Sequence, residues 1–255
     1  MFSLRVLRTL AVLAFVPFGG STLAKEVAAH HWSYNGPTGP THWATLEHEF
    51  GACGSGQQQS PIDIRPTAVQ EAKLPSIGFS YLPVPLRIID NGHTIQVNYA
   101  PGSFIDVDGH RYQLVQFHFH KPSEESINGK RHDMVAHLVH QDADGRLAVV
   151  AVLLKSGAIN PMVATLWNNL PSHKATELQP QGVAIDATDL LPADRAYYTF
   201  TGSLTTPPCS EGVTWFVLKN ASTLSAGEIS RFGHAYPMNA RPVQPLHGRV
   251  LRASQ

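Results

Sequence analysis

The chain has 255 residues, of which 43% are hydrophobic and 15% are charged, and its 19 basic residues balance 19 acidic ones. The apolar fraction is enough for a sizeable core, and no Lys/Arg block longer than Lys130-Arg131 occurs, which excludes a typical nucleic-acid-binding surface. No internal repeat or linker divides the chain. A single domain that binds a small or neutral ligand is favoured.

The N-terminal segment has the layout of a secretory signal peptide. Two arginines precede an apolar run at 10–18, and small residues end at Ala24. The run is too short to span a bilayer. We therefore expect removal of residues 1–24 and a mature single domain at 25–255 without a membrane span, periplasmic or secreted. An uncleaved interfacial anchor is the alternative.

The chain has two cysteines, Cys53 and Cys209. In an oxidising compartment they most simply form one disulfide, and two thiols cannot build a Cys-only zinc site. Closing so long a loop stabilises the folded chain by about 4 to 5 kcal/mol in the chain-entropy model. Two buried free thiols are expected only if the signal-peptide interpretation is wrong.

Strand patterns dominate the chain, and helical periodicity is scarce. The apolar, Val-rich run at 147–155 predicts a strand buried on both faces. Together the elements predict one large sheet with long loops and small peripheral helices. In chain order we expect strands at 88–99, at 103–107 and 111–120 around an Asp108-Gly109 turn, at 147–155 and at 213–219, and short helices at 161–170 and 225–232, the latter with a Ser225/Glu228 capping box.

Three histidines form a candidate metal site. Side chains alternate along a strand, so His118 and His120 share a face with Gln116, and their spacing of roughly 6.6 Å lets both rings reach one ion. Asn128-Gly129 is a strong hairpin signal that places His137 opposite His120, or at least beside the pair. Three neutral imidazoles without a fourth protein ligand describe a catalytic zinc site. For any one histidine alone, a satisfied core position is the alternative.

Motifs spread over the chain resemble the α-class carbonic anhydrases, in that family's order. The resemblance implies a mainly β (α+β) fold, with a large twisted, mostly antiparallel central sheet and short peripheral helices. It also implies zinc-dependent reversible hydration of carbon dioxide to bicarbonate and a proton. The motifs are HWSY at 31–34, QSPID at 59–63, NGH at 91–93, QFHFH at 116–120 with SE at 123–124, AHLVH at 136–140, SLTTPPC at 203–209 and MNARP at 238–242.

The resemblance also implies roles for individual residues. His118, His120 and His137 correspond to the zinc ligands. Thr205 corresponds to the hydroxyl that orients the attacking oxygen by accepting its hydrogen bond, and that donates its own hydrogen bond to Glu124. The other implied residues are His93 as proton shuttle, a task that His30 and His31 could share, Val139, Val149, Leu204, Thr205, Thr206 and Trp215 around the substrate, and Gln116, Tyr34 and Asn239 around the ligands and the proton path.

Two positions depart from the family pattern. Val135 stands where the family usually has a glutamate that accepts the ring N–H of the third ligand, and Glu125 stands where it tends to have histidine. Losing such an acceptor typically costs roughly 10- to 100-fold in metal affinity or activity. We therefore expect an active enzyme with weakened zinc retention. A buried water or a backbone carbonyl then serves His137, or its nitrogen is left unpaired, and Glu125 either perturbs Glu124 or faces solvent.

Three other classes of protein fit parts of the pattern. An inactive carbonic-anhydrase-like binding domain is kept open by Val135, although the three histidines argue against it. A cupin-type metalloenzyme shares the His-x-His and Glu124 spacing, but it needs glycines where the chain has Tyr112 and Arg131. A purely structural sheet protein leaves the 205–208 loop unexplained. The oligomeric state is left open, with a homodimer as one option.

Overall fold

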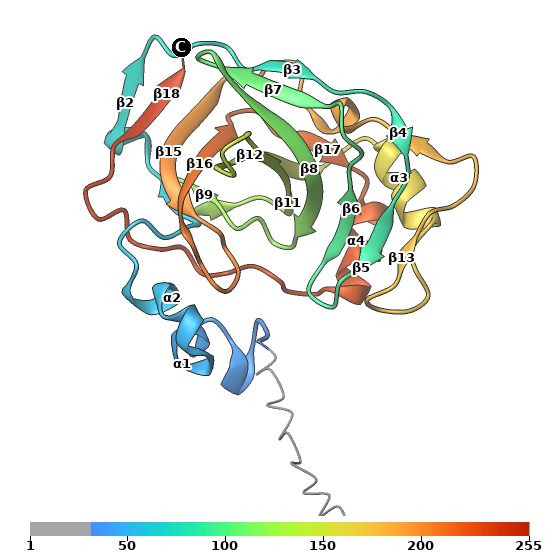
Figure 1. Cartoon of the computed structure of the whole chain (residues 1–255), viewed down its shortest axis with the longest axis horizontal. Coiled ribbons are helices and arrows are strands. Elements are labelled where there is room, and N and C mark those ends of the chain that lie inside the picture. Colours follow the sequence, from blue (N-terminus) through green and yellow to red (C-terminus); the bar gives the residue numbers. More distant parts are fainter. Residues whose placement is uncertain (1–31, 255) are drawn as a thin grey trace, which may run out of the picture. The chain divides into compact units, whose positions relative to one another are not determined.

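The computed structural model describes residues 32–254, so the predicted signal peptide lies outside the described residues. Strands make up most of the regular structure, and one sheet of 13 strands dominates it (Figure 1). Its main path runs through β13 (Glu177–Leu178), β5 (Ile88–Asp90), β6 (Ile95–Asn98), β8 (His110–His120), β11 (Met134–Gln141), β12 (Leu147–Ser156), β16 (Glu211–Leu218), β15 (Tyr197–Ser203), β18 (Leu251–Ser254) and β2 (Val69–Ala72).

Most neighbouring strands of this sheet are antiparallel, in agreement with the predicted fold class. β12 instead pairs in parallel with β16 and with β17 (Ser222–Leu224), and β18 pairs in parallel with β2. The sheet also includes β7 (Phe104–Val107), which pairs with β8, and β3 (Gly78–Ser80), which pairs with β7. Two small sheets are formed by β1 (Asp63–Ile64), β9 (Ser126–Ile127) and β10 (Lys130–Arg131), and by β4 (Val84–Pro85) and β14 (Ala184–Ile185).

The expected strand at 88–99 is divided into β5 and β6 by a tight turn. Asn91 Oδ1 accepts hydrogen bonds from the backbone amides of His93 and Thr94, each at 3.0 Å. Such a turn is a local preference of asparagine and competes with the strand ladder. It places His93 at the turn that joins the two strands.

The sheet separates two apolar clusters, and β12 lies between them. Val150 and Val152 belong to one cluster, and Val149 and Ala151 to the other, with all four at most 2% exposed. The prediction of a strand buried on both faces is confirmed. Phe117 and Phe119 of β8 face the first cluster. The histidines between and beside them therefore point to the side of the second cluster.

Short helices cover the first cluster. Trp167 of α3 lies 5.2 Å from Phe119 and 5.7 Å from Phe232 of α4, measured between ring centroids. Both predicted helices are present, and the Ser225/Glu228 capping box begins α4. The helices are α1 (Trp43–Leu46), α2 (Ala52–Ser55), α3 (Pro161–Asn168) and α4 (Ala226–Ala235), with 3-10 turns η1 (Gly36–Thr38), η2 (His48–Phe50), η3 (Pro66–Ala68) and η4 (Ala187–Leu190).

Candidate metal centre and active site

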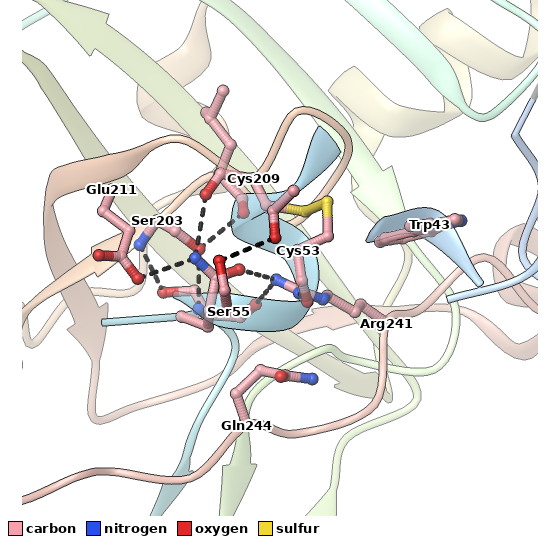
Figure 2. Close-up of a disulfide and its surroundings, with 12 residues drawn as sticks. Trp43, Cys53, Ser55, Ser203, Cys209, Glu211, Arg241 and Gln244 are labelled. Carbon is pink, nitrogen blue, oxygen red and sulfur yellow. Dashed lines mark hydrogen bonds between the residues drawn. A yellow bond between two sulfur atoms is a disulfide. The ribbon is translucent and has the colours of Figure 1, made fainter. Parts of the chain in front are cut away.

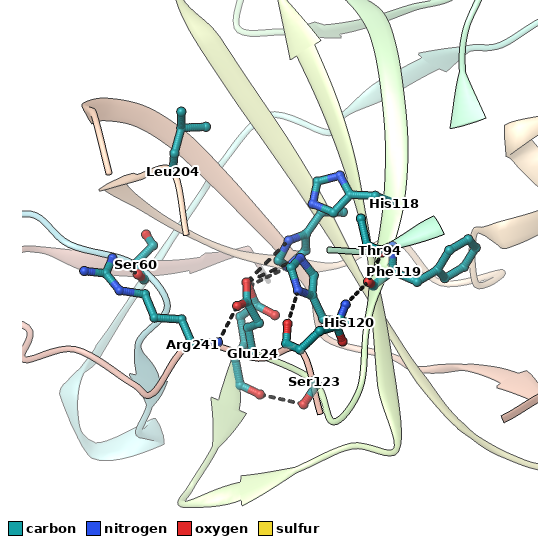
Figure 3. Close-up of polar contacts among 12 residues, drawn as sticks. Ser60, Thr94, His118, Phe119, His120, Ser123, Glu124, Leu204 and Arg241 are labelled. Atoms are coloured by element: carbon teal, nitrogen blue, oxygen red, sulfur yellow. Dashed lines mark hydrogen bonds and ion pairs between the residues drawn. The ribbon is translucent and has the colours of Figure 1, made fainter. Parts of the chain in front are cut away.

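The three histidines of the predicted zinc site lie together on two adjacent strands. His118 and His120 belong to β8, and His137 of β11 pairs directly with His118 across the antiparallel ladder. One nitrogen of each ring lies within 4.8 Å of the corresponding nitrogens of the other two. Figure 3 shows His118 and His120 on β8, close to Glu124.

Two of the imidazoles have one nitrogen held by a protein acceptor, which leaves the other nitrogen for a metal. His118 Nδ1 donates to Gln116 Oε1 at 2.8 Å, and His120 Nδ1 donates to the backbone carbonyl of Asn239 at 2.7 Å. His120 Nε2 is buried and has no hydrogen-bond partner within residues 32–254. A buried, unpaired nitrogen that faces two other imidazoles fits a zinc ion with three histidine ligands and one open position.

The charge state of the rings suits a metal. Burial, together with the neighbouring imidazoles, lowers the pKa of His118 to about 3 and the pKa of His120 well below its ordinary value. Burial also acts to lower the pKa of His137, but the carboxylates of Glu125 and Glu124 outweigh it and raise that pKa. Two neutral imidazoles and a third that is flanked by two buried carboxylates are a donor set suited to a dication.

The acceptor for His137 is Glu125, contrary to the expectation drawn from Val135. His137 Nε2 donates to Glu125 Oε1 at 3.0 Å, and Glu125 is 0% exposed, so it does not face solvent. Val135 is equally buried within the second apolar cluster. The expectation that His137 depends on a water or a backbone carbonyl is therefore wrong. A carboxylate reaches the ring from the loop between β8 and β9 rather than from β11.

Glu124 lies against the histidines and is held by a segment distant in sequence. Its Oε1 accepts from the backbone amide of Arg241 at 2.7 Å, and its Oε2 lies 3.5 Å from His120 Nε2 (Figure 3). Burial raises the pKa of Glu124 to about 7, whereas hydrogen bonds from the Thr205 side chain and the Arg241 amide act to lower it. The structure thus brings Thr205 and Glu124 together.

Apolar side chains border the histidines on the same face of the sheet. Val139, Val149 and Trp215 are direct neighbours across β11, β12 and β16. The Trp215 ring lies edge to face with His137, at 5.0 Å between centroids. Leu204, on the loop after β15, packs against the same cluster. The resulting wall suits a small uncharged molecule.

His93 belongs to an aromatic group next to the metal site. Its ring stacks on Trp32 with 3.6 Å between centroids, and Trp32 contacts Tyr34 edge to face at 5.3 Å. Burial raises the pKa of Tyr34 well above its ordinary value, so its hydroxyl stays protonated. Asn239 Nδ2 donates to the His93 carbonyl at 3.0 Å, while the Asn239 carbonyl accepts from His120. One asparagine therefore connects the turn of His93 to a histidine of the site.

A disulfide anchors the loop that carries Thr205 and Thr206. Cys53 and Cys209, 156 residues apart, are joined as predicted (Figure 2). Backbone hydrogen bonds from Leu204 to Ser210 and from Cys209 to Thr206 close the loop on itself. The position of Thr205 is thus fixed by covalent as well as hydrogen-bonded constraints.

Sequence reasoning assigned no role to Arg241 or Trp32. Of its two alternatives for Glu125, exposure to solvent is wrong, whereas an influence on Glu124 is present, because the charge of Glu125 acts to raise the pKa of Glu124. The contact of Glu125 with His137 was not foreseen. Arg241 is 1% exposed, and its guanidinium donates to the carbonyl of Cys53 (Figure 2) and to the carbonyl of Ser60. A signal for Glu125 existed in the sequence, since two adjacent carboxylates precede a strand whose expected carboxylate is missing. His30 and His31, the other predicted shuttle candidates, lie outside the described residues.

Between Trp32 and Ser254, no helix combines the length and the apolar character needed to cross a membrane.

Comparisons with known proteins identify the family of the chain. The family model for the eukaryotic-type carbonic anhydrase matches residues 38–255. A carbonic anhydrase of Klebsiella pneumoniae is 44% identical over 234 residues, which are 91% of this chain and 94% of that protein.

Solved structures give the same result. The α-carbonic anhydrase of Thermovibrio ammonificans, solved with the inhibitor sulfanilamide, is 40% identical with a TM-score of 0.84, covering 88% of this chain and 99% of that chain. A hyperthermostable carbonic anhydrase from a hydrothermal vent chimney is 46% identical with a TM-score of 0.85, covering 88% and 100%. The chain belongs to the α-carbonic anhydrase family of zinc enzymes, which catalyse the reversible hydration of carbon dioxide.

Proposed function

We propose that His118, His120 and His137 hold the zinc with which this chain converts carbon dioxide and water to bicarbonate and a proton. The convergence of three imidazole nitrogens within 4.8 Å, one of them the buried and unpaired His120 Nε2, carries this proposal. Zinc at this site supplies a water of lowered pKa, and thus a nucleophile near neutral pH, as carbonic anhydrases exemplify.

Thr205 and Glu124 orient the attacking oxygen. When Glu124 is ionised, its carboxylate can only accept hydrogen bonds, so the Thr205 hydroxyl donates its hydrogen bond to Glu124. The Thr205 oxygen is then available only as an acceptor, and the proton of the attacking oxygen points toward it. A lone pair of the attacking oxygen is left directed at the carbon of the substrate. The Arg241 amide, 2.7 Å from Glu124 Oε1, keeps the carboxylate in place.

The apolar wall positions carbon dioxide. The molecule has no net charge, and a water-poor surface of Val139, Val149, Leu204 and Trp215 holds it without competing for the nucleophile. Thr206 adds one polar group at the edge of this wall. Bicarbonate is charged, so the same wall favours its departure.

His93 carries the released proton outward. Each turnover leaves one proton to remove, and histidine is the side chain whose ordinary pKa lies near neutral pH. The buried hydroxyl of Tyr34 and the contact of His93 with Trp32 give this path an ordered aromatic boundary. Asn239 holds the backbone of His93 against the ligand strand.

A carbonic-anhydrase-like binding domain without catalysis is the second candidate. Val135 was the reason to consider it, because a ligand without its acceptor binds zinc poorly. The contact between Glu125 and His137 removes that reason.

The test is stopped-flow hydration of carbon dioxide by the chain, with zinc quantified in the same sample. We expect fast hydration with about one zinc per chain, abolished by a chelator and restored by stoichiometric zinc. Because the Thermovibrio ammonificans structure contains sulfanilamide, inhibition by that compound provides an independent check of the same site. A zinc-loaded chain that neither hydrates carbon dioxide nor binds sulfanilamide would support the binding-domain alternative.

We also propose that the chain is exported, with residues 1–24 removed and residues 25–255 active as one domain in the periplasm or outside the cell. The Cys53–Cys209 disulfide supports an oxidising compartment. N-terminal sequencing of the mature protein from a cell that exports it tests cleavage near Ala24. Light scattering on the same preparation distinguishes a monomer from the homodimer left open by the sequence.

A further inference from the structure

Two departures from the family pattern meet at one imidazole. Val135 lacks the carboxylate expected on β11, and Glu125 places a carboxylate where none was expected. In the structure Glu125 Oε1 lies 3.0 Å from His137 Nε2. The inference below rests on the proposed role of His137 as a zinc ligand.

We propose that Glu125 is the positioning residue of His137, and that Glu125 and Val135 form one compensated exchange that preserves zinc retention. The carboxylate has moved from the strand that carries the ligand to the loop before it. Glu125 touches neither substrate nor metal. It acts by fixing which nitrogen of His137 carries the proton and how the ring is turned.

The contacts of His137 support this role. Glu125 Oε1 binds Nε2, and Glu124 Oε2 lies 3.8 Å from Nδ1, on the side of the other histidines. A proton held on Nε2 by Glu125 leaves the Nδ1 lone pair free for a metal. Without Glu125, neither the choice of protonated nitrogen nor the rotation of the His137 ring would be fixed.

The loop holds Glu125 in this position through its backbone. Ser123 Oγ donates to the Glu125 carbonyl at 2.8 Å, and the His132 amide donates to Ser123 Oγ at 2.9 Å. The next residue, Ser126, donates its amide to the Ile62 carbonyl at 3.3 Å. Tied on both sides, the 0% exposed Glu125 carboxylate has little freedom to turn toward solvent.

The other oxygen of Glu125 gives an independent reason to expect positive charge at this point. Glu125 Oε2 is buried and has no hydrogen-bond partner in the described part of the chain. A buried carboxylate with an unpaired oxygen is costly unless a positive charge offsets it. A dication bound to His137 would supply that positive charge, with the imidazole ring between it and Glu125.

The surroundings of Val135 explain why the carboxylate does not sit on β11 in this chain. Val135 is 0% exposed in an apolar cluster, and its paired neighbours are Leu153 and His120. With Glu124 and Glu125 already buried nearby, a carboxylate at 135 would add a third negative charge. We therefore expect a carboxylate at position 135 to improve zinc retention only when Glu125 is absent.

The test measures zinc release from the loaded enzyme into excess chelator for Glu125→Ala, Glu125→Gln and the double variant Glu125→Ala/Val135→Glu. We expect release to become roughly 10- to 100-fold faster in Glu125→Ala. We expect a smaller acceleration in Glu125→Gln, whose amide oxygen still accepts, and recovery to within a few-fold of the original rate in the double variant. The exposed Glu71→Ala, which also removes one carboxylate, should not change the rate.

Proton NMR of the zinc-loaded proteins supplies a signature that general destabilisation would not reproduce. We expect the carboxylate-bound Nε2 proton of His137 downfield in the original enzyme, shifted in Glu125→Gln and lost in Glu125→Ala. Unchanged zinc release with an unchanged resonance in the isosteric Glu125→Gln and in Glu125→Ala overturns the positioning role. If the double variant releases zinc as fast as Glu125→Ala does, the proposed compensation between Glu125 and Val135 is wrong.

His137→Ala separates this inference from the proposed function. If His137→Ala still retains one zinc tightly, the proposed ligand set is wrong. If it loses zinc while Glu125→Ala keeps it at the original rate, the ligand set stands and only the present inference fails.

Discussion

The indole of Trp32 lies flat against the imidazole of His93, with ring centroids 3.6 Å apart and ring planes 7° from parallel. Trp32 in turn contacts Tyr34 and Trp43, which are 9% and 0% exposed. The proposed shuttle therefore rests on a fixed aromatic surface. The stacking contact thus holds the His93 ring in one orientation against the aromatic group of Trp32, Tyr34 and Trp43.

Replacing His93 with alanine should lower carbon dioxide turnover by roughly 10- to 100-fold in weak buffer, because proton removal loses its carrier. Stopped-flow rates with and without added imidazole measure the effect, and imidazole should restore the rate. Zinc content should not change. His173→Ala, at an exposed loop position, serves as control. An unaltered rate in weak buffer would assign the proton path elsewhere.

Replacing Thr205 with valine should lower kcat by about 100-fold, because the attacking oxygen loses its orientation while the shape of the side chain is kept. Zinc content and sulfanilamide binding show whether the site remains assembled. The matched control is Thr201→Val, an exposed threonine on β15. Activity within a few-fold of the original would contradict the role proposed for the Thr205 hydroxyl.

Loss of the Cys53–Cys209 disulfide should lower the free energy of unfolding by about 4 to 5 kcal/mol, the loop-closure value for a bridge spanning 156 residues. Urea unfolding of Cys53→Ser/Cys209→Ser measures this loss. The original chain in excess reductant should approach the same midpoint. Coinciding midpoints for the oxidised and reduced chains would show that the hydrogen bonds of the 204–210 loop suffice alone.

The buried His140 should make the fold sensitive to acid. Its Nε2 lies 2.8 Å from the Tyr81 hydroxyl, and burial lowers its pKa to about 3. An unfolded chain takes up this proton near pH 6.5 and the folded chain does not, so stability falls as pH drops from about 6.5 toward 3. The contribution of one such group is at most about 1.4 kcal/mol per pH unit.

His140→Gln should therefore show a shallower loss of stability with falling pH than the original chain. Urea unfolding at several pH values measures both slopes. Both proteins are used zinc-free, so that protonation of the ligand histidines contributes equally. The exposed His173→Gln should keep the original slope. Parallel curves for the original chain and His140→Gln would refute the assignment.

Much of the metal site was predictable because it depends on local periodicity. Strand alternation alone put His118 and His120 on one face. The expectation that His137 lies beside this pair is confirmed, although its direct partner is His118 and not His120, the residue that the hairpin arithmetic puts opposite it. The β9–β10 hairpin keeps the expected register, with Arg131 opposite Ser126. The discrepancy arises between the hairpin and β8, because residues 121–125 form a longer arm than residues 132–134.

The positions that depend on distant contacts were not predictable in the same way. Whether the Glu125 carboxylate turns inward is decided by Ser123 and His132, which meet only in the folded loop. The parallel pairing of β12 with β16 leaves no local pattern in the sequence either. The positions of strands along the chain could be predicted from residue type. Which strands pair with one another is visible only in the assembled sheet.

The metal site and the groups that make it catalytic come from different parts of the chain. His118, His120, His137 and both carboxylates lie between β8 and β11, whereas Thr205 and the Arg241 amide arrive from beyond β15. Affinity for zinc and speed of reaction can therefore diverge separately during evolution. Substitutions confined to the 204–210 loop could therefore produce an inactive protein that still binds zinc.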